Sequence, residues 1–302
     1  MDTSPDRYLR AARRVSTERR YAQAIEHFEA EWGGLLPTSS ASVVRYLATY
    51  GSRLAASTLR THLAALAQWH QQRGFIDPTK AAQVRDSLRG IQALHPQPVK
   101  QAPALQLYVL EAAIEGLSAD LHSGQPAQRL RAARDQALIL LGFWRAFRGD
   151  ELCRLQAEHV RIEAGEGMQM LLPSSKTDRD NRGRNLTMPA LQRLCPVQAT
   201  EQWLQLSGIA QGPLFRGIDR WGHLSVQPLN ANSVSRLLRQ ALSRSGVEAE
   251  GYSAHSLRRG FATWASRNQW STEDLMAYVG WRDVQSATRY IDPATPFGNW
   301  LR

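Results

Sequence analysis

A proline-rich stretch near residue 100 divides this chain into two parts. The segment His95–Pro103 holds three prolines within nine residues. Proline has no backbone N–H to donate inside a helix, and it restrains the residue before it to extended conformations. We therefore predict a linker over residues 96–103, between a first domain at 1–95 and a second at 104–302. A chain of 302 residues is long enough for two ordinary domains.

The first part of the chain has the pattern of a helical domain. Apolar and small residues recur there at helical spacing in four segments, and glycine, proline and serine turns separate them. The segments are Tyr21–Trp32, Ala41–Tyr50, Ser57–Gln72 and Thr79–Leu94. This domain is therefore predicted to be helical.

The second part combines helices with one short sheet. Apolar spacing predicts helices at 104–118, 128–147, 190–206, 231–245, 255–268 and 272–279, the last capped by Ser271 and ended by Gly280. Strands are predicted at Val160–Ile162, Met168–Leu172 and Asn185–Met188, with a polar hairpin at 173–184 joining the last two. The predicted fold is mainly α, with a helical N-terminal domain and a mostly α second domain that holds a small antiparallel sheet (α+β).

The bulk properties favour an anionic partner such as nucleic acid. The formal net charge is +10, and hydrophobic residues make up 43% of the chain, which suffices for packed cores. No apolar run reaches the roughly 18 residues of a transmembrane helix, so a cytoplasmic protein is expected. Cys153 and Cys195 are too few for a disulfide framework, and the eight histidines lack metal-ligand spacing. We therefore expect no metal site.

One series of residues near the C-terminal end indicates phosphodiester chemistry. His255 and Arg258 lie three residues apart on a predicted helix, Trp281 follows 23 residues later, and Tyr290 comes nine residues after that. A phenol oxygen can attack a phosphate and hold it covalently. The planar fork of arginine suits the charged phosphate oxygens, and histidine titrates near neutral pH. These residue types together suit a tyrosine nucleophile acting on DNA.

An arginine further upstream is expected in a turn between two helices. The apolar run from Ala137 predicts a helix that ends at Phe147, with Gly149 breaking it and Asp150 capping the next helix. Arg148 would then be fixed in the turn, with Glu151 placed to hold it by an ion pair.

In order and spacing, these motifs resemble those of the tyrosine recombinases of the phage-integrase family. The family pattern of arginine, lysine, His-x-x-Arg, His or Trp, and tyrosine falls here on Arg148, Lys176, His255, Arg258, Trp281 and Tyr290. The resemblance covers nearly the whole chain. It implies a core-binding domain at 1–95, a catalytic domain at 104–302, and a site-specific recombinase or integrase that cleaves and rejoins DNA.

The resemblance also implies a role for each residue. Tyr290 would form a 3′-phosphotyrosyl link, and strand exchange would pass through a Holliday junction without ATP, metal or another cofactor. Arg148 and Arg258 would hold the phosphate, with Glu151 in support. His255 would accept the tyrosine proton or bind the phosphate. Trp281, a hydrogen-bond donor only, would contact a phosphate oxygen or pack beneath the site.

Lys176 has an additional argument from composition. The chain has 34 arginines and only three lysines, and Lys176 is the one lysine beyond residue 100. A general acid must lose a proton, which arginine in proteins does not do. A lysine in the predicted hairpin therefore suits protonation of the leaving 5′-oxygen.

The partners follow from the same resemblance. The resemblance implies double-stranded DNA with an inverted-repeat site as the substrate and a homotetramer that joins two such sites. It also implies accessory DNA-bending or directionality proteins. The protein is expected to be associated with the nucleoid and not with a membrane. Further DNA contacts are expected at Arg53, Arg60, Arg259 and Arg282, although a solvated basic face explains the first two equally well.

Two other functions fit part of the pattern. A type IB topoisomerase uses the same tyrosine chemistry but relaxes DNA without joining two sites. A DNA-binding protein with an inactive site would bind without cutting. The helical first domain and the linker favour the recombinase over the topoisomerase, and the full set of site residues disfavours the inactive binder.

Overall fold

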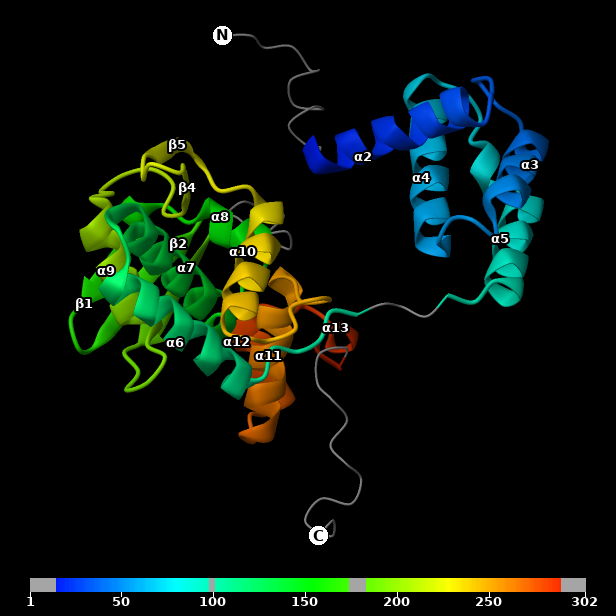
Figure 1. The fold of residues 1–302 in the computed structure, drawn as a ribbon. Coiled ribbons are helices and arrows are strands. Elements are labelled where there is room, and N and C mark those ends of the chain that lie inside the picture. The colour runs from blue at the N-terminus through cyan, green and yellow to red at the C-terminus, as the bar shows by residue number, and fades with distance from the viewer. Residues whose placement is uncertain (1–14, 98–100, 174–182, 289–302) are drawn as a thin grey trace. The chain divides into compact units, whose positions relative to one another are not determined.

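The computed structural model describes residues 15–97, 101–173 and 183–288. The chain forms two compact units, Met1–Lys100 and Gln101–Arg302, and the division falls inside the proline-rich segment (Figure 1). Helices predominate, and the strands form two small antiparallel sheets. The predicted fold class, mainly α with a small antiparallel sheet, is confirmed.

The first unit is helical throughout its described part. Its elements are α2 (Val15–Glu26), the π-helical turn η1 (His27–Glu31), α3 (Ser40–Tyr50), α4 (Ala56–Gln72), the 3-10 turn η2 (Pro78–Lys80) and α5 (Ala82–Leu94). Within it, α2 packs on α4 and α3 packs on α5. The four predicted helices are present, although the first begins earlier, at Val15, and passes into a π turn at His27.

A hydrogen-bonded aromatic cluster lies in the core of this unit. Tyr46 is fully buried, and its hydroxyl lies 2.8 Å from Nδ1 of His27 and 2.5 Å from Nδ1 of His62. A hydroxyl has one hydrogen to donate, so one of the two rings must supply the hydrogen of its own bond. Burial and the neighbouring His27 lower the pKa of His62, and burial raises the pKa of Tyr46.

We expect this cluster to make the first unit less stable in mild acid. The unfolded chain protonates His62 near its ordinary pKa of about 6.5, whereas the folded unit takes up that proton only at lower pH. The stabilisation is therefore complete above about pH 6.5 and is lost as the pH falls through the folded pKa. Thermal unfolding of the full chain should show a larger loss from about pH 7.5 to about pH 5.5 in the wild type than in His62→Gln. Equal losses would contradict this assignment.

The second unit builds several helices around one central helix, α7. Its elements are α6 (Leu107–Ser123), α7 (Pro126–Trp144), α8 (Gly149–Arg154), η3 (Ala157–His159), β1 (Val160–Glu163), β2 (Gly167–Leu172), β3 (Arg184–Pro189), α9 (Pro196–Ser207), β4 (Arg216–Ile218), β5 (Leu224–Pro228), α10 (Ala231–Arg244), α11 (Ala254–Arg267), α12 (Thr272–Val279) and α13 (Val284–Thr288). Helix α7 is buried from Ala132 to Phe143 and packs on α6, α9 and α11. The predicted sheet is present in the order β1-β2-β3, with Met170 opposite Leu186.

Several details of the second unit differ from the sequence prediction. Helix α7 ends at Trp144 rather than Phe147, because Ala146 turns the chain with φ at +50°. Gly149 begins α8 instead of breaking the preceding helix, and Arg148, not Asp150, is its N-cap residue. Helix α9 starts at Pro196, later than predicted, because proline suits a first helical position.

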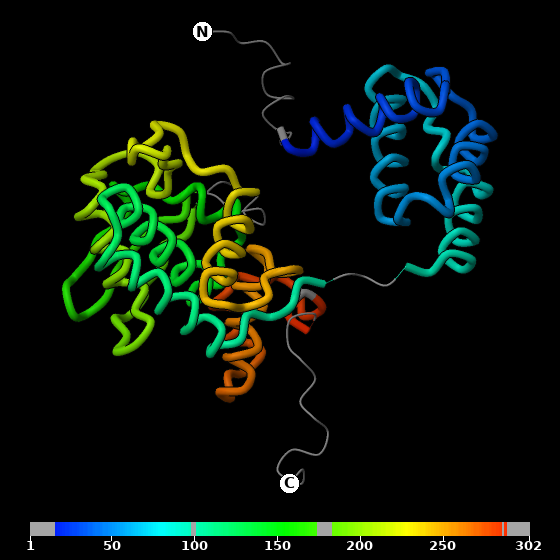
Figure 2. Tube along the Cα trace, viewed as in Figure 1, coloured from blue at the N-terminus to red at the C-terminus, as the bar shows by residue number. Residues whose placement is uncertain are grey.

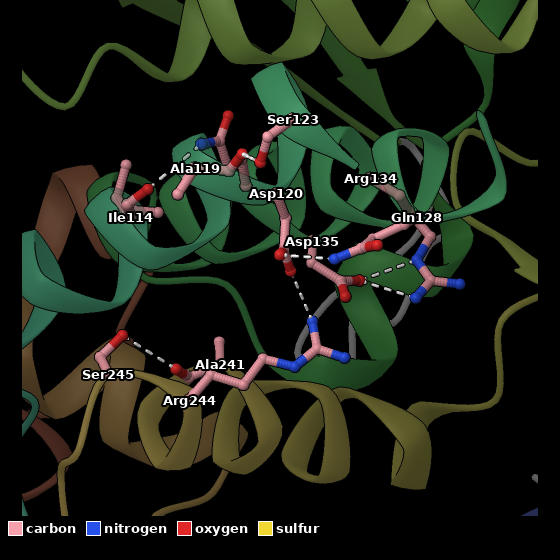
Figure 3. Close-up of polar contacts among 11 residues, drawn as sticks. Ile114, Ala119, Asp120, Ser123, Gln128, Arg134, Asp135, Ala241, Arg244 and Ser245 are labelled. Carbon is pink, nitrogen blue, oxygen red and sulfur yellow. Dashed lines mark hydrogen bonds and ion pairs between the residues drawn. The ribbon is translucent and has the colours of Figure 1, made fainter. Parts of the chain in front are cut away.

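Polar side chains connect α6 with α7 and α10 on the outer side of this core. The Asp120 carboxylate of α6 accepts hydrogen bonds from Gln128 of α7, at 2.6 Å, and from Arg244 of α10, at 3.0 Å (Figure 3). Nearby, Arg134 and Asp135 form a buried pair in α7 with an Nε–Oδ1 distance of 2.8 Å. The three helices are therefore tied by polar side-chain contacts as well as by apolar packing.

The segment entering the second unit lies against α11 (Figure 2). Leu105 N donates to the Ser256 carbonyl at 3.0 Å, and the Leu105 carbonyl faces Gly260 in the middle of α11. A Cβ at Gly260 would collide with that carbonyl and would lie 2.8 Å from the Phe143 ring. Glycine is required here by the close approach of two backbone segments.

We expect Gly260→Ala to lower the free energy of unfolding by about 1–3 kcal/mol, because overpacking outweighs the better helix propensity of alanine. The matched control is Gly90→Ala in α5, where an added Cβ meets nothing within 4 Å. The control should be stabilised by about 0.4–1 kcal/mol. Denaturant unfolding of the full chain measures both changes, and a stabilised Gly260→Ala protein would contradict the packing argument.

Candidate active site

Arg148 is fixed at the start of α8 by a single carboxylate. The Arg148 backbone N donates to Oε2 of Glu151 at 2.8 Å, and its Nη1 donates to Oε1 at 2.7 Å. Glu151 is buried, whereas the Arg148 side chain is 24% exposed. The expected ion pair is therefore present, and the Arg148 side chain remains partly exposed.

Arg258 reaches the same turn from α11. Its side chain is 1% exposed, and Nη1 donates to the Ala146 carbonyl at 2.6 Å. Ala146 is the residue with positive φ that turns the chain from α7 toward Arg148. The two arginines that sequence reasoning paired are therefore brought to one short turn by a buried hydrogen bond.

His255 lies at the exposed N-terminal end of α11. Ser253 is the N-cap residue of this helix, and its hydroxyl accepts the backbone N–H of His255 at 3.3 Å. The start of α11 touches the start of α8, since a Cβ added at Gly149 would lie 3.1 Å from the Ala254 Cβ. His255 therefore directly follows Ala254, the residue through which α11 meets the start of α8, and Arg148 caps that same helix.

Trp281 packs beside Arg258. The guanidinium carbon of Arg258 lies 5.1 Å from the Trp281 ring centroid, and the indole is 7% exposed. As predicted, Ser271 caps α12 and Gly280 ends it, here with φ at +78°. Trp281 N then donates to the Met276 carbonyl at 3.0 Å, which sets the direction of the chain beyond α12.

The structure places the other predicted residues in different settings. Lys176 and Tyr290 lie outside the described residues. Arg282 is exposed directly after Trp281. Arg259 is half-buried and donates to the Gln101 side chain. Arg53 and Arg60 are exposed in the first unit, after α3 and in α4.

Two further arginines line the same site, and sequence reasoning did not single them out. Arg145, Arg148, Glu151 and Arg184 all border a cavity of about 30 Å³ that reaches the end of α12. Burial, followed by the charge of Arg145, lowers the pKa of Arg184. In a chain with 34 arginines, nothing in the sequence distinguishes these two from surface arginines.

Three further features of the described part of the chain concern metal ligands, thiols and membrane spans. Across residues 15–97, 101–173 and 183–288, no group of three or more His, Cys, Asp or Glu side chains could hold a metal ion. Both cysteines are free thiols, and burial raises the pKa of Cys153 to about 12. None of the described helices is long and apolar enough to cross a membrane.

Comparison with known proteins identifies the family. The model of the phage integrase family matches residues 117–295, which is more than half of the chain. The chain is 29% identical over 270 residues to an integrase/recombinase XerD homolog of Selenomonas ruminantium, covering 87% of this chain and 76% of that protein. It is 24% identical over 277 residues to the Cre recombinase of Escherichia phage P1, covering 86% of this chain and 77% of that protein.

Solved structures show the same fold. The Tn1549 transposon integrase, in complex with transposon right end DNA, aligns with a TM-score of 0.64 at 15% identity, covering 97% of this chain and 94% of that one. The XerH recombinase bound to its palindromic difH substrate aligns with a TM-score of 0.63 at 17% identity, covering 90% and 75%. The chain is a tyrosine-type site-specific recombinase. It belongs to the phage integrase family.

Proposed function

We propose that this protein cuts and rejoins DNA at a specific site through a covalent link to Tyr290. The phenol oxygen attacks the scissile phosphorus, the P–O bond to the 5′-oxygen breaks, and a 3′-phosphotyrosyl link and a 5′-hydroxyl result. The 5′-hydroxyl of a partner strand then attacks that link and releases the tyrosine. Two such exchanges form and resolve a Holliday junction. Each step trades one phosphodiester for another, so neither ATP nor a metal is required.

We assign a role to each of the other groups from the charges and proton transfers that the two steps require. Arg148 and Arg258 stabilise the negative charge on the non-bridging phosphate oxygens. His255 takes the proton from the Tyr290 hydroxyl, and Lys176 gives a proton to the leaving 5′-oxygen. Glu151 holds Arg148 in place, and Trp281 packs against Arg258.

The observation that carries this proposal is the joint anchoring of the two arginines. Arg148 is the N-cap residue of α8 and Arg258 lies in α11, yet Arg258 donates to the carbonyl of Ala146, two residues before Arg148. This buried hydrogen bond ties Arg258 to the turn that leads to Arg148, which supports our assignment of both guanidinium groups to one phosphate. Surface arginines placed only for solubility would not need such an anchor.

We further propose double-stranded DNA with an inverted-repeat site as the substrate, bound by a homotetramer that joins two sites. The solved relatives include recombinases described as bound to DNA, among them a lambda integrase tetramer on a Holliday junction. The net charge of +10 suits the same partner. Residues 1–95 would act as the core-binding domain, with Arg53 and Arg60 at phosphates, and Arg259 and Arg282 would add contacts from the catalytic domain. Accessory DNA-bending or directionality proteins and a nucleoid location complete the proposal.

Covalent capture tests this function directly. The protein is mixed with a sheared, partly nicked library of DNA from its own source, and the adducts are trapped in detergent and sequenced at the attached ends. Adducts clustered on one inverted-repeat sequence support the recombinase. Adducts scattered over many sequences would indicate a topoisomerase instead, and tight binding without adducts would indicate an inactive DNA-binding protein.

A further inference from the structure

The C-terminal ends of α7 and α12 are joined by reciprocal hydrogen bonds. Nη2 of Arg145, the residue after α7, donates to the Tyr278 carbonyl in α12 at 3.1 Å. In return, the Tyr278 hydroxyl donates to the Trp144 carbonyl, at the end of α7, at 3.0 Å. The guanidinium carbon of Arg145 also lies 3.8 Å from the centroid of the Tyr278 ring. A side chain at the end of each helix therefore donates a hydrogen bond to a backbone carbonyl at the end of the other.

Arg184 adds a second cation to the end of α12. From the first residue of β3, its Nη2 donates to the carbonyls of Ala277 and Tyr278 at 2.7 and 2.8 Å. Its Nη1 lies against Gly280, at a point where a Cβ would collide with it. The last carbonyls of a helix carry partial negative charge and lack partners within the helix, so a cation there is stabilising.

The arrangement places three arginines beside one carboxylate. Glu151 is engaged by Arg148, and Arg145 is 6% exposed, with an Nε atom that finds no partner among the described residues. Arg145 and Arg184 are therefore held at this site chiefly by the α12 carbonyls and the Tyr278 ring. Placing the positive charges of Arg145 and Arg184 this close together is costly in a buried setting. This cost indicates that both arginines have a role beyond packing.

The position of this contact relates it to the chemistry. Arg145 begins the turn that leads to Arg148, and Gly280 leads directly into Trp281 and then toward Tyr290. We propose that Arg145 and Arg184 are positioning residues, which fix the end of α12, and hence the start of the chain that leads to Tyr290, against the turn that carries Arg148. The inference rests on the proposed function, because it is Tyr290 that this contact would align.

Two variants of Arg184 separate positioning from simple stability. Arg184→Met keeps the aliphatic stem and removes the donors, whereas Arg184→Lys keeps one cation that can reach a carbonyl. We expect Arg184→Met to form adducts on the nicked library about tenfold or more slowly at saturating protein, with DNA affinity unchanged within about twofold. Arg184→Lys should recover part of the rate. The matched control is Arg129→Met, since Arg129 Nε also donates to a carbonyl in the last turn of a helix, Leu121 of α6, at 3.0 Å.

Hydrogen exchange supplies a measurement that does not depend on activity. The amides of Gly280 and Trp281 both donate to the Met276 carbonyl, so they report whether the end of α12 stays closed. Their exchange should be at least about tenfold faster in Arg184→Met, and unchanged in Arg129→Met.

Unchanged exchange in Arg184→Met would overturn the positioning role, whatever the activity. Faster exchange with an undiminished adduct rate would overturn it too, because the contact would then serve stability alone. A wild-type protein that forms no adducts, but whose exchange responds to Arg184→Met as expected, would overturn the proposed function and leave only the structural contact.

Discussion

Tyr290→Phe protein is expected to form no detectable covalent adduct with DNA. Phenylalanine retains the ring but lacks the hydroxyl oxygen that would bond to phosphorus, so the first chemical step has no nucleophile. DNA affinity should stay within about twofold of the wild type, because phosphate contacts by basic side chains dominate binding. Covalent capture in detergent measures the first quantity, and a mobility shift at fixed salt measures the second.

A second tyrosine provides the matched control for that experiment. Tyr108 in α6 is 71% exposed, and Tyr108→Phe removes the same hydroxyl from the same residue type. Its adduct yield should equal that of the wild type. Adducts that persist in Tyr290→Phe would exclude Tyr290 as the nucleophile, and the family resemblance would then not extend to the chemistry of this chain.

Arg258→Met is expected to damage both activity and stability. Loss of the guanidinium removes one of the two proposed phosphate-binding cations, and single donors of this kind are worth about a hundredfold or more in rate. The Ala146 carbonyl also loses its buried partner, which should lower the free energy of unfolding by about 1–3 kcal/mol. Single-turnover adduct formation and denaturant unfolding measure the two effects separately.

A neighbouring arginine on the same helix shows whether the effect is specific. Arg267 lies at the end of α11, is exposed and donates to the Gln106 side chain at 3.0 Å. Arg267→Met should retain the wild-type adduct rate and nearly all of the stability, as surface substitutions usually do. A folded Arg258→Met protein that formed adducts within about fivefold of the wild-type rate would remove Arg258 from the phosphate site.

Local sequence signals were sufficient for most of the helices and for the first sheet. Segments such as Ser57–Gln72 carry apolar residues at helical spacing, and the observed α4 starts one residue earlier and ends at the same place. Ser271 and Gly280 marked both ends of α12 correctly because capping and helix termination depend on the residue itself and its near neighbours in the chain. The ion pair of Arg148 with Glu151 was also accessible, since the two residues lie three positions apart.

Features set by distant parts of the chain could not be predicted in this way. Alanine rarely adopts a positive φ, so nothing in the sequence at Ala146 indicated that α7 ends early. The turn there is supported by a hydrogen bond from Arg258, which lies 112 positions away in the sequence. The hairpin of β4 and β5 was missed because its strands are short and contain no buried residue that would give an alternating apolar pattern. Arg145 and Arg184 gain significance only from contacts with α12.

The contact between Arg184 and Gly280 has an evolutionary consequence. Position 280 is restricted twice, by its left-handed backbone and by the guanidinium that occupies the space of a Cβ. A homologue with a larger residue at position 280 would have to tolerate both constraints, and it could relieve the second by shortening the side chain at position 184. Substitutions at these two positions, which are 96 apart in the sequence, are therefore expected to covary across the family.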